Sequence, residues 1–320
     1  MEPRPPRPLT RDETHRILAY GDSLTAGYLM HSPMTQEYAP WAPVLAEALG
    51  LPCNAVGASG WKTEEMVARS AYGGADACGE WCPGLQQLLD EEKRVRPPGY
   101  AAVLIMAGTN DLGVASSDTI VANLRELHAQ CHAAGCVTVA LTIPQGRQLG
   151  PWTQSTPIAF ADERRQRVNA ALREYASEQP AGRCLFAAMD DEVPWFERSA
   201  NYEADGLHMS AAGYAKFGTA LAPKVREFLH RAVAAKALEE RDPGGSAVDP
   251  PGPPLLARSS SDDEDDPVAA ADLILSAPPP RRGRACSLLS AYSQRRNHEM
   301  EVSENRGGGR SVGIPSVLQE

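Results

Sequence analysis

The amino-acid sequence predicts an α/β fold in which a central parallel sheet of about five strands is covered on both faces by helices. Short apolar runs alternate with longer amphipathic stretches over most of the chain. The runs are continuously apolar, which is typical of parallel strands that are buried on both faces. Polar or glycine-rich clusters follow several of these runs, at the edge where an open parallel sheet gathers its functional groups.

Five apolar runs are expected to form the strands, and the amphipathic stretches are expected to form the helices that cover them. The strand runs are residues 17–20, 51–56, 101–107, 137–143 and 183–187. The helical stretches are residues 39–49, 84–95, 116–134, 158–177 and 210–237. Because strand–helix–strand units cross over in the right-handed sense, these elements predict three layers with the sheet in the middle.

The composition changes toward the C-terminal end, and this change divides the chain. From Asp242 onward there is no Phe or Trp, prolines cluster, and residues 259–266 read SSSDDEDD. Such a segment buries too little apolar surface to offset its conformational entropy. We therefore expect a flexible segment over residues 1–14, a folded domain over residues 15–238 and a disordered tail rich in Pro, Ser and acidic residues over residues 239–320.

Two stretches of the predicted tail are typical of phosphorylation contexts. Residues 281–287 read RRGRACS, and the acidic serine run at 259–266 is the second candidate. A regulatory protein or a kinase is the partner that these stretches would bind. The same residues fit a simple solvated tail equally, since serines beside charges are common in disordered segments.

The charge and the hydropathy exclude several classes of partner. Lys and Arg number 31 against 41 Asp and Glu, a net charge of −10, whereas surfaces that bind nucleic acid or anionic lipid need a cationic field. The apolar run at 101–107 is far shorter than the roughly 18 residues that suggest a membrane span. The N-terminal residues contain Arg and Pro but lack the apolar core of a secretory signal, so we expect a cytoplasmic location.

Seven cysteines are scattered along the chain without a paired framework. Cys78 and Cys82 form a Cys-x-x-x-Cys pair that is a candidate for a disulfide or a metal site. A structural zinc site normally needs a matching second pair, which the sequence lacks. We therefore expect no metal, and most of the cysteines to be reduced core residues.

Ser23, Asp205 and His208 supply the groups for nucleophilic catalysis at the predicted edge of the sheet. Ser23 follows the first strand in GDSLTAGY, where its hydroxyl either reacts or simply caps a helix. A serine hydroxyl needs a base, and His208 in DGLHMS follows the fifth strand. Gly206 lets the chain turn so that Asp205 reaches Nδ1 of His208, while Nε2 faces Ser23. An isolated Asp-Gly would indicate only a turn, but the shared edge favours a catalytic role.

Gly60 and Asn110 are expected to donate hydrogen bonds to an oxyanion. Gly60 follows the second strand, and its backbone N–H can approach a ligand closely because no Cβ intervenes. Asn110, in AGTND after the third strand, offers its side-chain amide, and the Ser23 N–H is the third donor. Taken singly, Gly60 also fits a loop that needs positive φ, and Asn110 an Asx turn. Three donors at one edge favour acyl transfer.

Four sequence blocks resemble those of the GDSL, or SGNH, hydrolase family and occur in the family's order. They are GDSL around Ser23, a glycine block at Gly60, GTND at Asn110 and DGLH ending at His208. The resemblance implies a flavodoxin-like three-layer α/β/α sandwich, a catalytic triad of Ser23, His208 and Asp205, and an oxyanion hole formed by Ser23, Gly60 and Asn110. It further implies hydrolysis of carboxylic esters through an acyl-enzyme intermediate, without a cofactor.

The resemblance also gives Asp22 a structural role in shaping the first turn, and it favours Gly60 over the competing Gly57 because Gly60 directly precedes Trp61. The substrate is expected to be a small-molecule ester. Members of the family act on short-chain esters, aryl esters, lipids, thioesters and acetylated sugars, so the acyl group stays open. The aromatic-containing segments 61–83 and 144–157 fit a lid or acyl pocket and fit local packing anchors equally.

Two other classes of function need to be weighed. A nucleotide- or flavin-binding protein would carry a G-x-G-x-x-G or Walker-type loop after the first strand, and this sequence has neither there. A catalytically idle member of the family would use the same site to bind an acyl or carbohydrate group. The intact Ser23, Asn110, Asp205 and His208 favour an enzyme, and ester turnover distinguishes the two.

Overall fold

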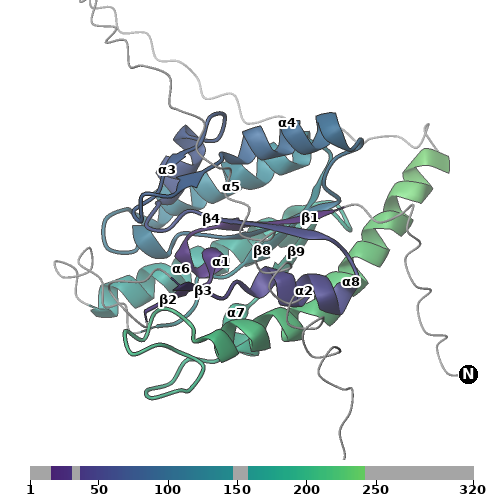
Figure 1. Ribbon diagram of the computed structural model, residues 1–320. Coiled ribbons are helices and arrows are strands. Elements are labelled where there is room, and N and C mark those ends of the chain that lie inside the picture. The colour runs from purple at the N-terminus through teal and green to yellow at the C-terminus, as the bar shows by residue number, and fades with distance from the viewer. Residues whose placement is uncertain (1–15, 31–36, 147–157, 242–320) are drawn as a thin grey trace, which may run out of the picture.

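The computed structural model describes residues 16–30, 37–146 and 158–241, with a five-stranded sheet at its centre (Figure 1). The strands are β1 (Ile17–Gly21), β4 (Cys53–Gly57), β7 (Ala102–Met106), β8 (Val137–Leu141) and β9 (Cys184–Ala187). Neighbouring strands all pair in parallel, in the order β4-β1-β7-β8-β9. The predicted α/β fold and its five strands are confirmed.

The strand order reverses at β1, and this reversal indicates where a ligand is expected. β1 pairs with β4 on one side and with β7 on the other, so that Ala19 lies opposite both Ala55 and Leu104. This is the order of flavodoxin-like sheets, in which ligands bind outside the carboxyl ends of the strands at the reversal. The residues that follow β1 and β7 are therefore the first candidates for a site.

Helices cover both faces of the sheet, which gives the three layers that the sequence predicts (Figure 1). One face carries α2 (Trp41–Leu49), α7 (Met189–Glu192) and α8 (Ala211–Arg241). The other face carries α4 (Leu85–Val95), α5 (Ser117–Ala133) and α6 (Ile158–Glu178). The five longest of these helices correspond to the five predicted amphipathic stretches, and α7 lies between β9 and the loop that leads to α8.

The side chains of β1 explain why its sequence is apolar without interruption. Successive residues of a strand point to opposite faces of the sheet. Ile17 and Ala19 pack in the core under α2 and α8, whereas Leu18 and Tyr20 pack in the core under α4 and α5. All four are fully buried because both faces are covered.

Most of the short elements have no counterpart in the predicted pattern. Two antiparallel pairs join β2 (Tyr28–Leu29) to β3 (Glu37–Tyr38) and β5 (Gly74–Ala75) to β6 (Trp81–Cys82). The short helices are α1 (Ser23–Ala26), α3 (Thr63–Ala68) and the 3-10 helix η2 (Thr109–Asp111). Of these, only α1 is expected from the sequence. Hydrophobic periodicity needs a window of about 11–18 residues, so elements of this length leave no periodic signal.

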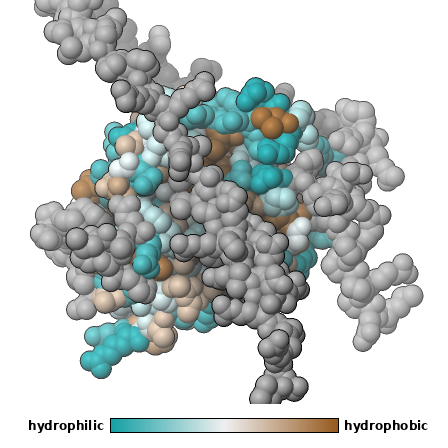
Figure 2. Space-filling view, in the orientation of Figure 1, coloured by the Kyte–Doolittle hydropathy of each residue, from teal (hydrophilic) through white to brown (hydrophobic). Residues whose placement is uncertain are grey.

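The described surface carries hydrophilic residues interspersed with small hydrophobic patches on the face seen in Figure 2. None of the described helices is long and apolar enough to cross a membrane. The helix α8 continues to Arg241, and the remainder of the predicted tail lies outside the described residues, as does the predicted N-terminal segment.

Candidate active site

Ser23 is the first residue of α1 and is separated from the end of β1 by Asp22 alone, at the reversal of the strand order. The cap of this helix is Asp22, whose Oδ1 accepts a hydrogen bond from the Leu24 N–H at 3.0 Å. The Ser23 hydroxyl is therefore not needed as a cap. Its Oγ instead lies 3.0 Å from Nε2 of His208.

The loop before α8 brings Asp205 and His208 together and orients the imidazole. Nδ1 of His208 donates to Oδ2 of Asp205 at 2.6 Å. The other carboxylate oxygen, Oδ1, accepts the backbone N–H groups of Leu207 at 2.9 Å and of His208 at 3.0 Å. The turn between them needs Gly206, whose φ of 67° lies in the left-handed region. The structure thus joins Ser23, His208 and Asp205 in one chain of hydrogen bonds.

The Asp205 carboxyl is adapted to remain ionised beside His208. Burial acts to raise its pKa, but the hydrogen bonds from the His208 ring and from the Leu207 N–H outweigh burial and hold the pKa below its ordinary value. The side chains of His208 and Asp205 are only 11% and 10% exposed, so little water screens the pair. A positive charge that develops on the imidazole is therefore stabilised.

The glycine loop, which we define as residues 58–61, follows β4 at the same edge of the sheet. The Ala58 N–H donates to the carbonyl of Gly21 at the end of β1, at 2.8 Å. Gly60 has a φ of +78°, and a Cβ at this position would lie 2.6 Å from the Cβ of Ala77. Only glycine fits here, because a side chain would be both strained and obstructed.

Asn110 lies in η2, directly beyond β7, and is joined to the glycine loop. Its Nδ2 donates to the carbonyl of Trp61 at 3.0 Å, a contact between residues 49 apart in the chain. This bond uses one of the two amide hydrogens and fixes the amide plane. Among the described residues, no hydrogen-bond partner is found for the second hydrogen. The loops that carry Ser23, Gly60 and Asn110 are therefore linked to one another by hydrogen bonds.

Asp111 supports this arrangement, and the sequence reasoning does not single it out. Its carboxylate accepts the Thr63 hydroxyl at 2.7 Å and the Thr63 N–H at 3.1 Å, which ties η2 to the start of α3. Burial raises its pKa, although the bonds from Thr63 act in the opposite direction. Its position beside Asn110 in GTND is the only sequence signal that points to it.

Tyr28 is a second neighbour of the site that the sequence does not indicate. Its ring lies 5.0 Å from the imidazole of His208, with an angle of 56° between the ring planes. The Tyr28 carbonyl accepts the Tyr214 hydroxyl at 3.3 Å, which holds β2 against α8. Tyr28 therefore limits the rotation of His208. This contact depends on tertiary packing between distant segments and leaves no local signal.

Asp22 is fully buried beside Ser23. One carboxylate oxygen caps α1, while Oδ2 is buried and has no hydrogen-bond partner of good geometry within the part of the chain that the structure describes. Burial raises the pKa of this carboxyl to about 7, against which the Leu24 N–H and the nearby His208 act only partly. The structural role that the sequence suggests for Asp22 is consistent with its position as the helix cap, and the charged form is unfavourable there.

We expect Asp22→Asn to change the pH dependence of stability. In the folded protein the pKa of Asp22 is about 7, above the ordinary 3.8. The contribution of this carboxyl to the stability of the wild type is therefore fully present below pH 3.8 and is lost as the pH rises through 7. Asparagine stays neutral. Relative to the wild type, the variant should therefore gain on the order of 2–4 kcal/mol in free energy of unfolding between pH 4 and 8.

Urea unfolding at several pH values between 4 and 8 measures this gain. Asp90→Asn, an exposed position on α4, is the matched control and should follow the wild-type pH profile. Parallel profiles for Asp22→Asn and the wild type would contradict a raised pKa at Asp22.

The aromatic residues of segment 61–83 include both buried and exposed side chains. Trp61 is 2% exposed, its Nε1 donates to the Ala75 carbonyl at 3.1 Å, and the Arg69 guanidinium lies 4.9 Å from its ring centre. It is a packing anchor. Tyr72 and Trp81 are exposed. Most of segment 144–157, including Trp152, lies outside the described residues.

The site contains no metal-binding cluster within the described ranges, where no group of three or more His, Cys, Asp or Glu residues is placed to hold an ion. Of the cysteine pair noted in the sequence, Cys82 is buried, with Sγ 3.7 Å from the Gly57 carbonyl, and Cys78 is half-buried.

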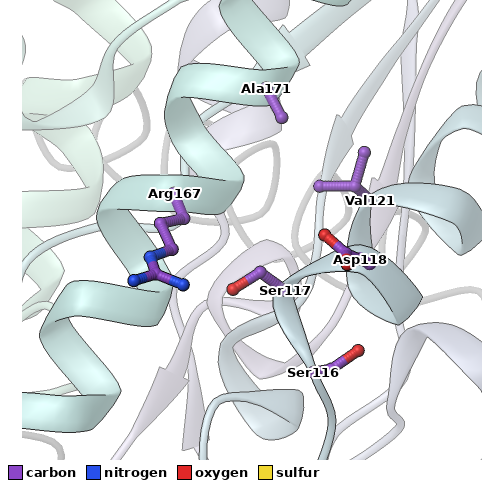
Figure 3. Close-up of a pocket in the computed structure, with 6 residues that line it drawn as sticks. All are labelled: Ser116, Ser117, Asp118, Val121, Arg167 and Ala171. Atoms are coloured by element: carbon purple, nitrogen blue, oxygen red, sulfur yellow. The ribbon is translucent and has the colours of Figure 1, made fainter.

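A separate pocket of about 240 Å³ lies between the start of α5 and the middle of α6 (Figure 3). It is lined by Ser116, Ser117, Asp118, Val121, Arg167 and Ala171. Arg167 is largely exposed and pairs with Glu163 at 2.5 Å. No residue of this pocket belongs to the hydrogen-bonded chain around Ser23, so the two sites are distinct.

Of two similar solved structures, the first supports the fold. The chain is similar to Est24, a carbohydrate acetylesterase from Sinorhizobium meliloti, at 20% identity and a TM-score of 0.50, over 67% of this chain and 99% of that one. It is also similar to a GDSL-like lipase from Bacteroides thetaiotaomicron, at 19% identity and a TM-score of 0.46, over 68% of this chain and 91% of that one.

Comparison by sequence identifies the family. A search of curated proteins gives no match. Residues 19–216, more than half of the chain, match the GDSL-like lipase/acylhydrolase family. This range begins within β1 and ends within α8, so it contains the sheet, Ser23, Gly60, Asn110 and the Asp205–His208 loop. The resemblance found in the four sequence blocks is confirmed: the chain belongs to the GDSL-like lipase/acylhydrolase family, whose general activity is the hydrolysis of esters.

Proposed function

We propose that the protein is a serine hydrolase that cleaves carboxylic esters of small molecules through an acyl-enzyme intermediate. The observation that carries this proposal is the chain of hydrogen bonds from Ser23 Oγ through His208 to Asp205, at 3.0 and 2.6 Å. A nucleophile within reach of a base, with the base oriented by a third group, is the arrangement that activates a hydroxyl.

In the proposed reaction, Ser23 Oγ attacks the ester carbonyl carbon while Nε2 of His208 takes the hydroxyl proton. The imidazolium then gives this proton to the leaving alkoxide, and the acyl group remains on Ser23. A water molecule, deprotonated by the same nitrogen, attacks the acyl-enzyme. The imidazolium then returns this proton to Ser23 Oγ as the carboxylic acid is released, which restores the free enzyme. Asp205 keeps the proton of the neutral imidazole on Nδ1 and stabilises the imidazolium throughout.

The negative charge on the tetrahedral intermediate requires donors. We assign them to the backbone N–H groups of Ser23 and Gly60 and to Nδ2 of Asn110. The hydrogen bond from Asn110 to the Trp61 carbonyl supports this assignment, since it joins the amide to the glycine loop and leaves one hydrogen for the oxyanion.

Ester turnover and covalent labelling of the purified protein test the proposal. We expect hydrolysis of p-nitrophenyl esters and a fluorophosphonate adduct that peptide mass spectrometry locates on Ser23. A catalytically idle member that only binds an acyl or carbohydrate group would give neither result. A series of esters from acetate to palmitate would also give the chain length that the site accepts.

Asn110→Ala is expected to slow catalysis while leaving the nucleophile reactive. The variant loses one oxyanion donor, so kcat should fall by about 10²–10³, and a fluorophosphonate should still label Ser23. Steady-state kinetics on p-nitrophenyl acetate measure the loss. Asn54→Ala is the control, since Asn54 lies in β4 and bonds to the Tyr100 hydroxyl. A wild-type kcat in Asn110→Ala would exclude this amide from the oxyanion hole.

Three further expectations remain predictions from the sequence alone. These are the cytoplasmic location, the absence of a nucleic-acid partner, and a kinase or regulatory protein that binds within residues 239–320.

A further inference from the structure

The hairpin formed by β5 and β6 lies against the glycine loop, residues 58–61. Asp76 closes this hairpin, because its Oδ1 accepts the backbone N–H groups of Cys78 and Glu80, each at 2.9 Å. Its other oxygen, Oδ2, reaches out of the hairpin and accepts the N–H of Ser59 at 3.0 Å. One carboxylate therefore shapes the turn and attaches it to the glycine loop.

Two more hydrogen bonds join the hairpin to the residues on either side of Gly60. The Ala77 N–H donates to the Ser59 carbonyl at 2.9 Å, and Nε1 of Trp61 donates to the Ala75 carbonyl at 3.1 Å. Gly60 itself lies close to the hairpin, since a Cβ there would be 2.6 Å from the Cβ of Ala77. Three consecutive residues of the hairpin, Ala75, Asp76 and Ala77, therefore hold the glycine loop on both sides of Gly60.

These bonds fix the direction of the Gly60 N–H. The Ser59 carbonyl and the Gly60 N–H belong to one peptide group, and in a trans peptide the C=O and N–H bonds point in opposite directions. Ala77 holds the carbonyl on the side of the hairpin, so the Gly60 N–H points away from the hairpin. The bond from the Ser59 N–H to Asp76 restrains the preceding peptide group, which opposes rotation of the plane.

We propose that Asp76 is a positioning residue for ester hydrolysis, which holds the hairpin so that the Gly60 N–H is aimed at the oxyanion. This inference rests on the proposed role of Gly60 as an oxyanion donor. Asp76 does not touch the substrate and acts through Ser59 and Ala77. Donors that are aimed before the reaction need no reorganisation during it, and a misplacement of about 1 Å can cost about 10²-fold in rate.

Replacement of Asp76 should lower kcat and leave KM nearly unchanged. In Asp76→Ala the donor is still present but poorly aimed, so kcat should fall about 10- to 100-fold while KM changes less than about twofold. Asp76→Asn keeps one oxygen that accepts N–H groups, so its loss should be smaller, about 3- to 10-fold. Glu80→Ala is the control, since Glu80 is exposed on the same hairpin and joins the turn through its backbone. It should keep the wild-type kcat.

A boronic acid gives a readout that a purely structural role would not change. It adds to the serine hydroxyl as a tetrahedral anion, so its inhibition constant should rise in the Asp76 variants by the same factor by which kcat falls. If Asp76→Ala lacks a cooperative melt, Asp76→Asn decides the question. A wild-type kcat in every folded variant, or a loss that appears in KM alone, overturns this inference. Absence of both turnover and labelling in the wild-type protein overturns the proposed function instead.

Discussion

Ser23→Ala is expected to abolish ester turnover and fluorophosphonate labelling together. Its hydroxyl faces Nε2 of His208 at 3.0 Å, and removal of this oxygen leaves nothing at that position to form the acyl-enzyme. The loss in kcat should be on the order of 10⁶-fold. Hydrolysis of p-nitrophenyl acetate and in-gel fluorescence of the labelled protein measure the two effects.

His208→Ala should lose turnover to about the same extent, because the serine is present but its base is not. The double variant of Ser23 and His208 should be no less active than either single variant, since residues that act as a unit are not additive. Ser117→Ala, at the start of α5, is the control and should keep wild-type activity. Wild-type turnover by Ser23→Ala, in protein free of contaminating esterase, would show that Ser23 is not the nucleophile and that the GDSL block has only a structural role.

Asp205→Asn is expected to lower kcat by up to about 10⁴-fold while the protein remains folded. In the wild type, Oδ1 of Asp205 accepts two backbone N–H groups and Oδ2 accepts Nδ1 of His208. An asparagine that keeps its oxygen on the backbone groups turns its NH₂ toward Nδ1. The imidazole must then carry its proton on Nε2, where it cannot accept the proton of Ser23.

Activity of Asp205→Asn could be lost through unfolding or through the change of tautomer at His208. Thermal melting detects the first cause, and steady-state kinetics on the folded variant measure the second. Asp191→Asn, at an exposed position in α7, is the control for loss of a carboxylate and should keep the wild-type kcat. A loss of only a few fold in Asp205→Asn would contradict tight coupling and would leave Ser23 and His208 as a dyad.

The sequence predicts the sheet and the long helices because each of them depends on burial that repeats along the chain. β7 is apolar throughout and β8 is apolar except for Thr138, since both faces of these strands lie against helices. The helix α5 has the length that makes a periodic face visible. The four blocks of the candidate site are also recognisable, because they resemble the blocks of the GDSL family and occur in the family's order.

The residues that hold the candidate site in position are harder to predict from the sequence, because their partners are distant along the chain. Asp76 accepts the N–H of Ser59 across 17 residues, and nothing near Asp76 distinguishes it from an ordinary turn aspartate. Tyr28 contacts the His208 ring although β2 and the loop before α8 are far apart in the chain. Trp61 is an example of the opposite error. An aromatic residue in the glycine loop fits a substrate pocket, yet its indole is buried against Ala75 and Arg69.

The separation of Ser23 and His208 by 185 positions has a consequence for biosynthesis. The proposed nucleophile belongs to the first described strand–helix turn, whereas its proposed base belongs to the loop just before α8, the last described helix. During synthesis of this domain, the serine is therefore made well before the histidine that we propose as its base. The proposed activity can begin only when nearly the whole domain has been synthesised and folded.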